Sequence, residues 1–259
     1  MKKLGLSLAL VLLAVVVVAV QAQDVPSDRV ARVEFMKIIP GKGAEYQKLE
    51  TLWKQEIHQD RVNKGQVESW NLFALMHPGG TKREYDVVAM HIFSSFAQME
   101  RMLDDAQVAK LQKFPAATEL RDMVRHEIWR LSSSAGTDPL AGEFADVRFH
   151  RAINGRGADY VSAVQNLWKP LNEELIKKGN RKGWLWFSVM FPGGTSRPYD
   201  WVTVDSLEKY SDVAGNTFAG VDQERLRLAL EVSSRGRETP THEYWRLVDR
   251  TSRKGKQGS

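Results

Sequence analysis

Apolar residues recur three or four positions apart in two long segments of this chain, which is the spacing of an amphipathic helix. In the first segment these residues are Tyr46, Leu49, Trp53 and Ile57, and in the second they are Val161, Val164, Leu167 or Trp168, Leu171 and Leu175. Each segment ends in lysine followed by glycine, a combination that is typical of helix ends. The pattern therefore predicts two amphipathic helices.

Segments with a two-residue alternation precede and follow each predicted helix. The first strands are expected at 32–39 and 146–153, and further helical regions at 94–121 and 206–233. Two strands should flank each Pro-Gly-Gly sequence, and a last strand should carry each His-Glu-x-Trp-Arg-Leu sequence. Each half then has the order strand, helix, strand, strand, helical region, strand.

Several motifs of the first half return in the second. Residues 76–81, Met-His-Pro-Gly-Gly-Thr, match residues 190–195, Met-Phe-Pro-Gly-Gly-Thr, at an offset of 114 residues (191 − 77). Residues 126–131 match residues 242–247 at an offset of 116 residues (242 − 126). Solenoid units repeat every 20–50 residues or so, which is much shorter. The repeat therefore indicates the duplication of a whole domain.

Both faces of the central strands are apolar. Residues 187, 189 and 191 are Phe, Val and Phe, whereas residues 184, 186, 188 and 190 are Trp, Trp, Ser and Met. A sheet with one solvated face should carry a polar set on that face. Helices in each half can cover only one face, so we expect the other face to pack against the sheet of the sister half.

This order of elements, with its long first helix and aromatic-rich sheet, resembles the dimeric α+β barrel superfamily, which includes antibiotic-biosynthesis-type monooxygenases, EthD-like proteins and NIPSNAP-like proteins. The resemblance lies in architecture, and no single family's motif is matched. It implies an α+β fold of two tandem ferredoxin-like βαββαβ repeats that pack sheet to sheet as an intramolecular barrel. The repeats would be residues 31–132 and 143–250, with a linker at 133–142.

The N-terminus has the pattern of a signal peptide at residues 1–22. Lys2 and Lys3 precede an apolar run from Leu4 to Val20, and small residues precede a cleavage site after Ala22. An uncleaved membrane anchor is the alternative. We expect export to the periplasm or secretion, with no membrane association after cleavage. Because the chain has no cysteine, disulfides and thiol chemistry are excluded.

The charge balance indicates no polyanionic partner. Without Lys2 and Lys3 the chain has 35 basic residues (37 − 2) and 32 acidic ones, a formal charge of +3. Basic residues are scattered except in the tail at 251–259, which is expected to be disordered. Nucleic-acid binding is therefore not expected. The repeats should pair internally, and the sequence leaves further oligomerisation open.

The His-Glu sequences are the first candidates for chemistry. They lack the second histidine of a zinc-protease motif and fall on predicted strands, so no metal site is expected, and no cofactor is predicted. We expect His126, His242 and Arg246 to face the barrel, either in a structural network with Asp86 or Asp200, or in catalysis. In catalysis His242 would be the general base, and Arg246 or Tyr244 would stabilise an oxyanion.

Differences between the halves indicate a ligand pocket. Five matched positions are Leu72, Val87, Ala89, His91 and Ile128 in the first half, but Trp186, Trp201, Thr203, Asp205 and Tyr244 in the second. We expect them to face the barrel and, with Trp184, to line a pocket for a small apolar or aromatic molecule. The alternative is that they fill the barrel. An exported binding protein is thus predicted, with a cofactor-independent oxygenase, isomerase or cyclase as the second hypothesis.

Overall fold

The computed structural model describes residues 27–80, 82–101, 103–194, 197–214 and 218–251. The predicted signal peptide lies outside the described residues, as does the predicted tail beyond Thr251. Among the described helices, none is both long and apolar enough to cross a membrane.

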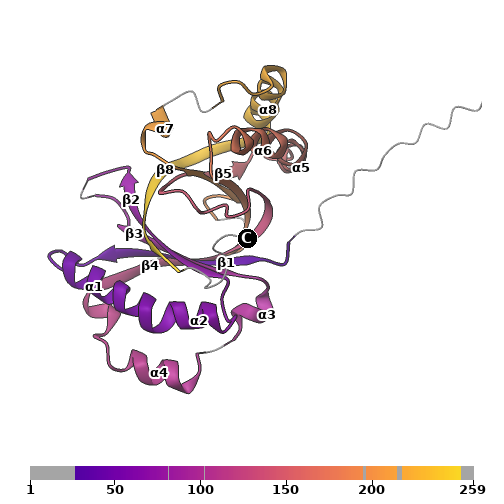
Figure 1. Ribbon diagram of the computed structural model, residues 1–259. Coiled ribbons are helices and arrows are strands. Elements are labelled where there is room, and N and C mark those ends of the chain that lie inside the picture. Colours follow the sequence, from indigo (N-terminus) through magenta and orange to yellow (C-terminus); the bar gives the residue numbers. More distant parts are fainter. Residues whose placement is uncertain (1–26, 81, 102, 195–196, 215–217, 252–259) are drawn as a thin grey trace, which may run out of the picture.

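Eight antiparallel strands form one closed barrel in the order β1-β3-β2-β8-β5-β7-β6-β4 (Figure 1). The strands are β1 (Val30–Ile38), β2 (Ser69–His77), β3 (Val87–Phe93), β4 (Arg121–Ala135), β5 (Phe144–Ala152), β6 (Gly183–Phe191), β7 (Trp201–Leu207) and β8 (Arg237–Arg250). Strands β1 to β4 and β5 to β8 thus alternate with helices in the same order in the two halves. The α+β class expected from the sequence is confirmed.

Helices cover the outside of the barrel on two sides (Figure 1). In the first half they are α1 (Gly43–Trp53), η1 (Lys54–His58), α2 (Gln59–Asn63), α3 (Phe96–Met99), α4 (Asp105–Leu111) and η2 (Ala117–Glu119). In the second half they are α5 (Gly157–Ala163), η3 (Val164–Trp168), α6 (Lys169–Lys177), α7 (Ser211–Ala214) and α8 (Gln223–Gly236). Segments η1 and η3 are π-helical turns inside otherwise continuous helices, a feature that is frequent at functional sites.

The two long last strands close the barrel. Strand β4 pairs with β1 of its own half and with β6 of the other half, and β8 pairs with β5 and β2 in the same way. The end of β4 includes Ser133 and Ala135, which pair with Trp186 and Trp184. The strand therefore continues into the segment expected to be linker, because its backbone finds hydrogen-bond partners in the other half.

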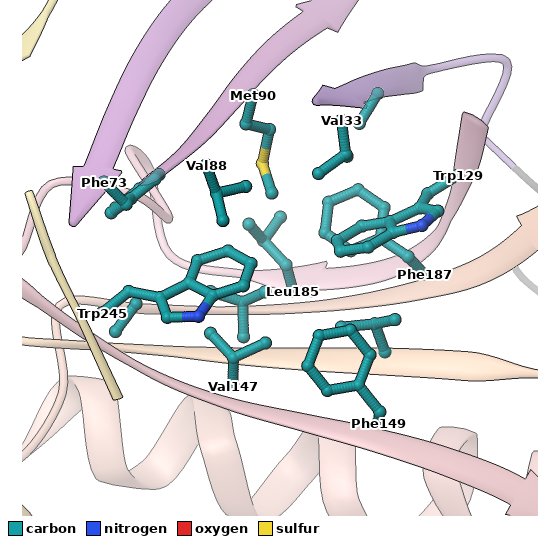
Figure 2. Close-up of a cluster of buried hydrophobic side chains, with 14 of the residues drawn as sticks. Val33, Phe73, Val88, Met90, Trp129, Val147, Phe149, Leu185, Phe187 and Trp245 are labelled. Carbon is teal, nitrogen blue, oxygen red and sulfur yellow. The ribbon is translucent and has the colours of Figure 1, made fainter. Parts of the chain in front are cut away.

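The barrel interior is apolar. The strand faces that line it are the ones that had been predicted to face the helices. Trp129 and Trp245 lie inside, together with Phe149 and Phe187 (Figure 2). The predicted pocket residues Trp184 and Trp186 face the helices instead, as do Trp201, Thr203 and Asp205 of the neighbouring strand β7. The expected barrel-side assignment was therefore wrong. Both faces are apolar, so the alternation separates them without identifying which one lies inside.

The repeated Pro-Gly-Gly loops are held by their aspartates. The carboxylate of Asp86 accepts hydrogen bonds from the Ile38 backbone N–H at 2.8 Å and from Arg83 Nε at 2.5 Å. The carboxylate of Asp200 accepts equivalent bonds at 2.7 Å from Ala152 N–H and at 2.7 Å from Arg197 Nε. These contacts anchor each loop to the end of the first strand of its half. Asp86 and Asp200 are therefore not the partners of His126 and His242, as had been expected, because the loop arginines and backbone occupy them; His242 contacts Asp146 instead.

Candidate ligand pocket between the sheet and the helices

A pocket lies between the barrel wall and the helices of the second half. The space between its walls, counted together with open solvent at its mouth, is about 360 Å³, so the enclosed part is smaller. Strands β5, β6, β7 and β8 form one side, and α5, η3 and α6 form the other. Its lining residues are Arg148, His150, Tyr160, Val164, Trp168, Asn172, Arg181, Trp184, Thr203, Asp205, Phe218 and Arg237. The pocket therefore combines aromatic walls with several charged groups, as small-molecule sites do.

The position of Trp168 depends on the π-helical turn η3, of which it is the last residue. Its indole Nε1 donates a 2.7 Å hydrogen bond to Ser233 Oγ on α8, and its ring lies 6.0 Å from the ring of Phe218. The extra residue in a π turn rotates the side chains that follow it. Trp168 is thereby fixed between two helices, where it forms a rigid wall of the pocket.

Aromatic rings also stand behind the pocket. Tyr160 lies 5.1 Å from Trp201 between ring centroids, and Trp186 stacks on Trp201 at 6.3 Å. Of the predicted ligand-binding residues, Trp184, Thr203 and Asp205 line the pocket, whereas Trp186 and Trp201 pack behind Tyr160. The sequence therefore identified a set of neighbours, although on the helix side of the sheet.

Charged groups form the back wall of the pocket. Asp205 accepts hydrogen bonds from Arg181 Nη1 at 2.6 Å and from Arg148 Nη1 at 3.1 Å. Arg148 also pairs with Asp146, and Arg181 also donates to Asn172 Oδ1. Burial raises the pKa of Asp205, while Arg181 and Arg148 oppose this rise. Since a buried charge needs partners, the interlocked pairs keep this wall in one arrangement.

His150 is a fully buried imidazole beside this wall. Its Nε2 lies 3.0 Å from Thr203 Oγ1, and its Nδ1 lies 3.2 Å from Thr239 Oγ1. Burial lowers the pKa of His150 well below its usual value, and nearby Arg237 and Arg148 lower it further. His150 is therefore neutral, with both ring nitrogens engaged.

The four predicted catalytic residues do not converge on one site. The side chain of His242 is 40% exposed, and its Nε2 lies 2.7 Å from Asp146 Oδ1. The Tyr244 ring lies 4.8 Å from the His242 ring. Arg246 is exposed further along β8, and His126 is exposed on β4 in the other half. Only His242 and Tyr244 are thus brought together, and Asp146 connects His242 to Arg148 of the pocket.

Sequence reasoning missed the arginines and His150. Arg148 and His150 alternate with the core residues Val147 and Phe149, so a period of two could have placed them opposite the barrel core. Arg181 precedes β6, and Arg237 is the first residue of β8. No local pattern identifies these two residues, because the barrel pairing brings them to the pocket.

Neither the family models nor the curated proteins include a match to this chain. Solved structures are similar in fold. A candidate monooxygenase from Fusobacterium nucleatum matches with a TM-score of 0.59 at 7% identity, over 87% of this chain and 94% of that chain. An anthrone oxidase-like protein matches with a TM-score of 0.53 at 10% identity, over 91% of this chain and 98% of that chain. A heme-binding protein from Thermus thermophilus matches with a TM-score of 0.50 at 11% identity, over 87% of this chain and 95% of that chain. At these identities the likeness establishes a shared α+β barrel fold.

Proposed function

We propose that this protein binds a small molecule with a flat apolar body in the pocket of its second half. The observation that carries the proposal is the pocket itself, where Trp168, Trp184 and Tyr160 form aromatic walls opposite a polar wall. Flat side chains favour a flat partner because stacked or edge-on rings gain more than area burial alone. Proteins of similar fold are described as an anthrone oxidase-like protein and as a heme-binding protein, which also supports a ligand-binding role.

The residues at matched positions differ between the two halves, and this difference supports a ligand pocket in the second half alone. At an offset of 114 residues, Trp168 corresponds to Lys54 (168 − 114) and Val164 corresponds to Glu50 (164 − 114). We interpret the halves as tandem ferredoxin-like repeats of which the second has become aromatic and ligand-binding. We also propose export, on the basis of the N-terminal apolar run.

Haem does not fit the lining of this pocket. Haem iron takes an axial ligand such as His, Cys, Met or Tyr. Among the lining residues, His150 has both ring nitrogens engaged by threonine hydroxyls. Burial raises the pKa of Tyr160 to about 12, so its phenol is protonated at neutral pH and is a poor ligand. We therefore propose an organic ligand without a metal centre.

A second candidate function is catalysis without a cofactor, of the oxygenase, isomerase or cyclase type. The 2.7 Å contact between His242 and Asp146 favours it, because a carboxylate that holds a histidine in one tautomer is a common arrangement for a general base. Tyr244 is near enough to contact a substrate beside this pair. Oxygen uptake with anthrone is a direct assay, and His242→Ala should abolish any turnover. An unchanged rate would remove His242 from the mechanism.

Native mass spectrometry of protein purified from its own host tests the binding proposal. We expect a retained small molecule that Trp168→Ala loses, because that change removes one wall of the pocket. Trp53→Ala is the matched control, since Trp53 is a half-buried tryptophan on the equivalent helix of the first half. Equal retention by both variants would contradict the assignment of the pocket. Circular dichroism would establish that both variants are folded.

A further inference from the structure

The charges around the pocket do not balance. Three of its lining residues are arginines, Arg148, Arg181 and Arg237, and the lining contains one carboxylate, Asp205. A second carboxylate, Asp146, pairs with Arg148 behind the lining. Since His150 is neutral, the described surroundings hold three cations and two anions. A partly buried cation without a counter-ion is costly, so the excess charge indicates a missing anion.

Arg237 is the cation without a counter-ion. Its side chain is half-buried, and in the described part of the chain no carboxylate lies within ion-pair distance of it. One guanidinium nitrogen donates to Thr239 Oγ1, whereas Nε is buried and has no hydrogen-bond partner. The guanidinium carbon lies 5.2 Å from the centre of the Tyr160 ring. The group is therefore held in place against an aromatic wall, with donor capacity left over.

The first half provides a matched comparison. Arg121 corresponds to Arg237 at the start of the last strand, and these two arginines pair with Ile38 and Ala152 at equivalent register positions. Arg121 lowers the pKa of both Glu34 and Glu50 through its charge, so two acidic side chains lie near it, although its Nε is buried without a hydrogen-bond partner like that of Arg237. In the second half those positions are Arg148 (34 + 114) and Val164 (50 + 114). The second half has thus lost the acids that accompany this arginine in the first half.

We propose that the ligand of this pocket carries one negative charge, of the carboxylate type, which pairs with Arg237. This inference rests on the proposed function, because it concerns the same pocket. A guanidinium presents parallel donors that match a carboxylate, and its charge strengthens each hydrogen bond. The apolar body of the ligand lies against Trp168 and Trp184, and its acidic end lies beside Tyr160. An aromatic or other flat monocarboxylate is the ligand class that satisfies both ends of the pocket.

Calorimetric titration with paired probes tests this inference. The acids are benzoate and 2-naphthoate, and their neutral counterparts are benzyl alcohol and 2-naphthylmethanol. We expect at least one acid to bind the wild type roughly tenfold or more tightly than its alcohol, the size of effect expected from a charge-assisted hydrogen bond. Arg237→Met should abolish this preference while it retains binding of the alcohol. Arg121→Met, in the first half, should leave the preference unchanged.

The outcomes separate the two proposals. If acid and alcohol bind the wild type equally and Trp168→Ala weakens the binding of both, the proposed ligand pocket is supported and the proposal of an anionic ligand is overturned. A preference for the acid that persists in Arg237→Met also overturns it. If neither probe of either pair binds the wild type, both proposals fail. Because Arg237→Met could disturb β8, Arg237→Lys serves as a second variant that retains the charge, and it should keep part of the preference.

Discussion

Glu127 of β4 accepts a 2.5 Å hydrogen bond from the hydroxyl of Tyr199, so that a carboxylate from the first half meets a phenol from the second. The arrangement is repeated in the opposite sense, because Tyr85 of the first half donates to Glu243 of the second. Each glutamate also accepts a hydrogen bond from the tryptophan two residues further on, at 2.6 Å in the first half and 2.8 Å in the second. The repeated His-Glu-x-Trp motif is therefore a structural connection between the halves inside the barrel.

Tyr199→Phe should destabilise the fold by about 1–3 kcal/mol, because it leaves the buried Glu127 carboxylate with one partner fewer. Urea unfolding followed by circular dichroism measures the change. Tyr210→Phe is the control, since Tyr210 is 42% exposed. Loss of the hydrogen bond between its hydroxyl and His77 should lower the free energy of unfolding by less than about 0.5 kcal/mol. Equal effects of the two changes would contradict the structural role assigned to Tyr199.

Asp205→Asn should cost about 3–5 kcal/mol, because it removes the negative partner of a buried arginine. The side chains of Asp205 and Arg181 are each 3% exposed. Glu208→Gln, which breaks the exposed pair with Lys182, should cost no more than about 1 kcal/mol. Thermal unfolding of both variants provides the comparison, and a cost for Asp205→Asn as small as the control would show that the charged wall is not needed for folding.

Glu50 should make stability fall as the pH rises from about 4.5 to 7. Burial raises the pKa of Glu50 to about 7 in the folded protein, from a usual value of 4.5, so the folded state keeps a proton that the unfolded state has released. The slope should approach 1.4 kcal/mol per pH unit, to order of magnitude. The unfolding free energy of Glu50→Gln is subtracted from that of the wild type at each pH. The difference isolates the titration of Glu50 from that of the buried histidines, which both proteins share. Parallel pH profiles for the two proteins would contradict it.

Gly183→Ala should disrupt the contact between β6 and the segment that joins the halves. A Cβ at Gly183 would lie 2.2 Å from Pro139 Cα, which is backbone and cannot move aside alone. Gly157→Ala is the control, because a Cβ there would meet Trp201 at an ordinary 3.4 Å and alanine favours the helix. We expect the first change to lower the melting temperature and the second to preserve it. A stable Gly183→Ala protein would mean that the joining segment is not held closely against β6.

Sequence alone predicted the strands closely, because their alternation and flanking turns are local signals. The first strands, expected at 32–39 and 146–153, are observed at Val30–Ile38 and Phe144–Ala152. The second helical regions were less well predicted. The region expected at 94–121 is divided among short helices, and the one expected at 206–233 begins only after β7 has ended at Leu207. Short helices are held by packing on the barrel more than by propensity.

The sequence by itself predicted that strands and helices follow the same order twice and that both faces of the central strands are covered, because periodicity and residue type record these features locally. Only the tertiary structure decided which face lies inside the barrel, since two apolar faces are equivalent until the strands close. The same closure brings Arg148, Arg181 and Arg237 together from separate strands and loops. A pocket built from such distant positions depends on the pairing of whole strands, and no local pattern of residues encodes that pairing.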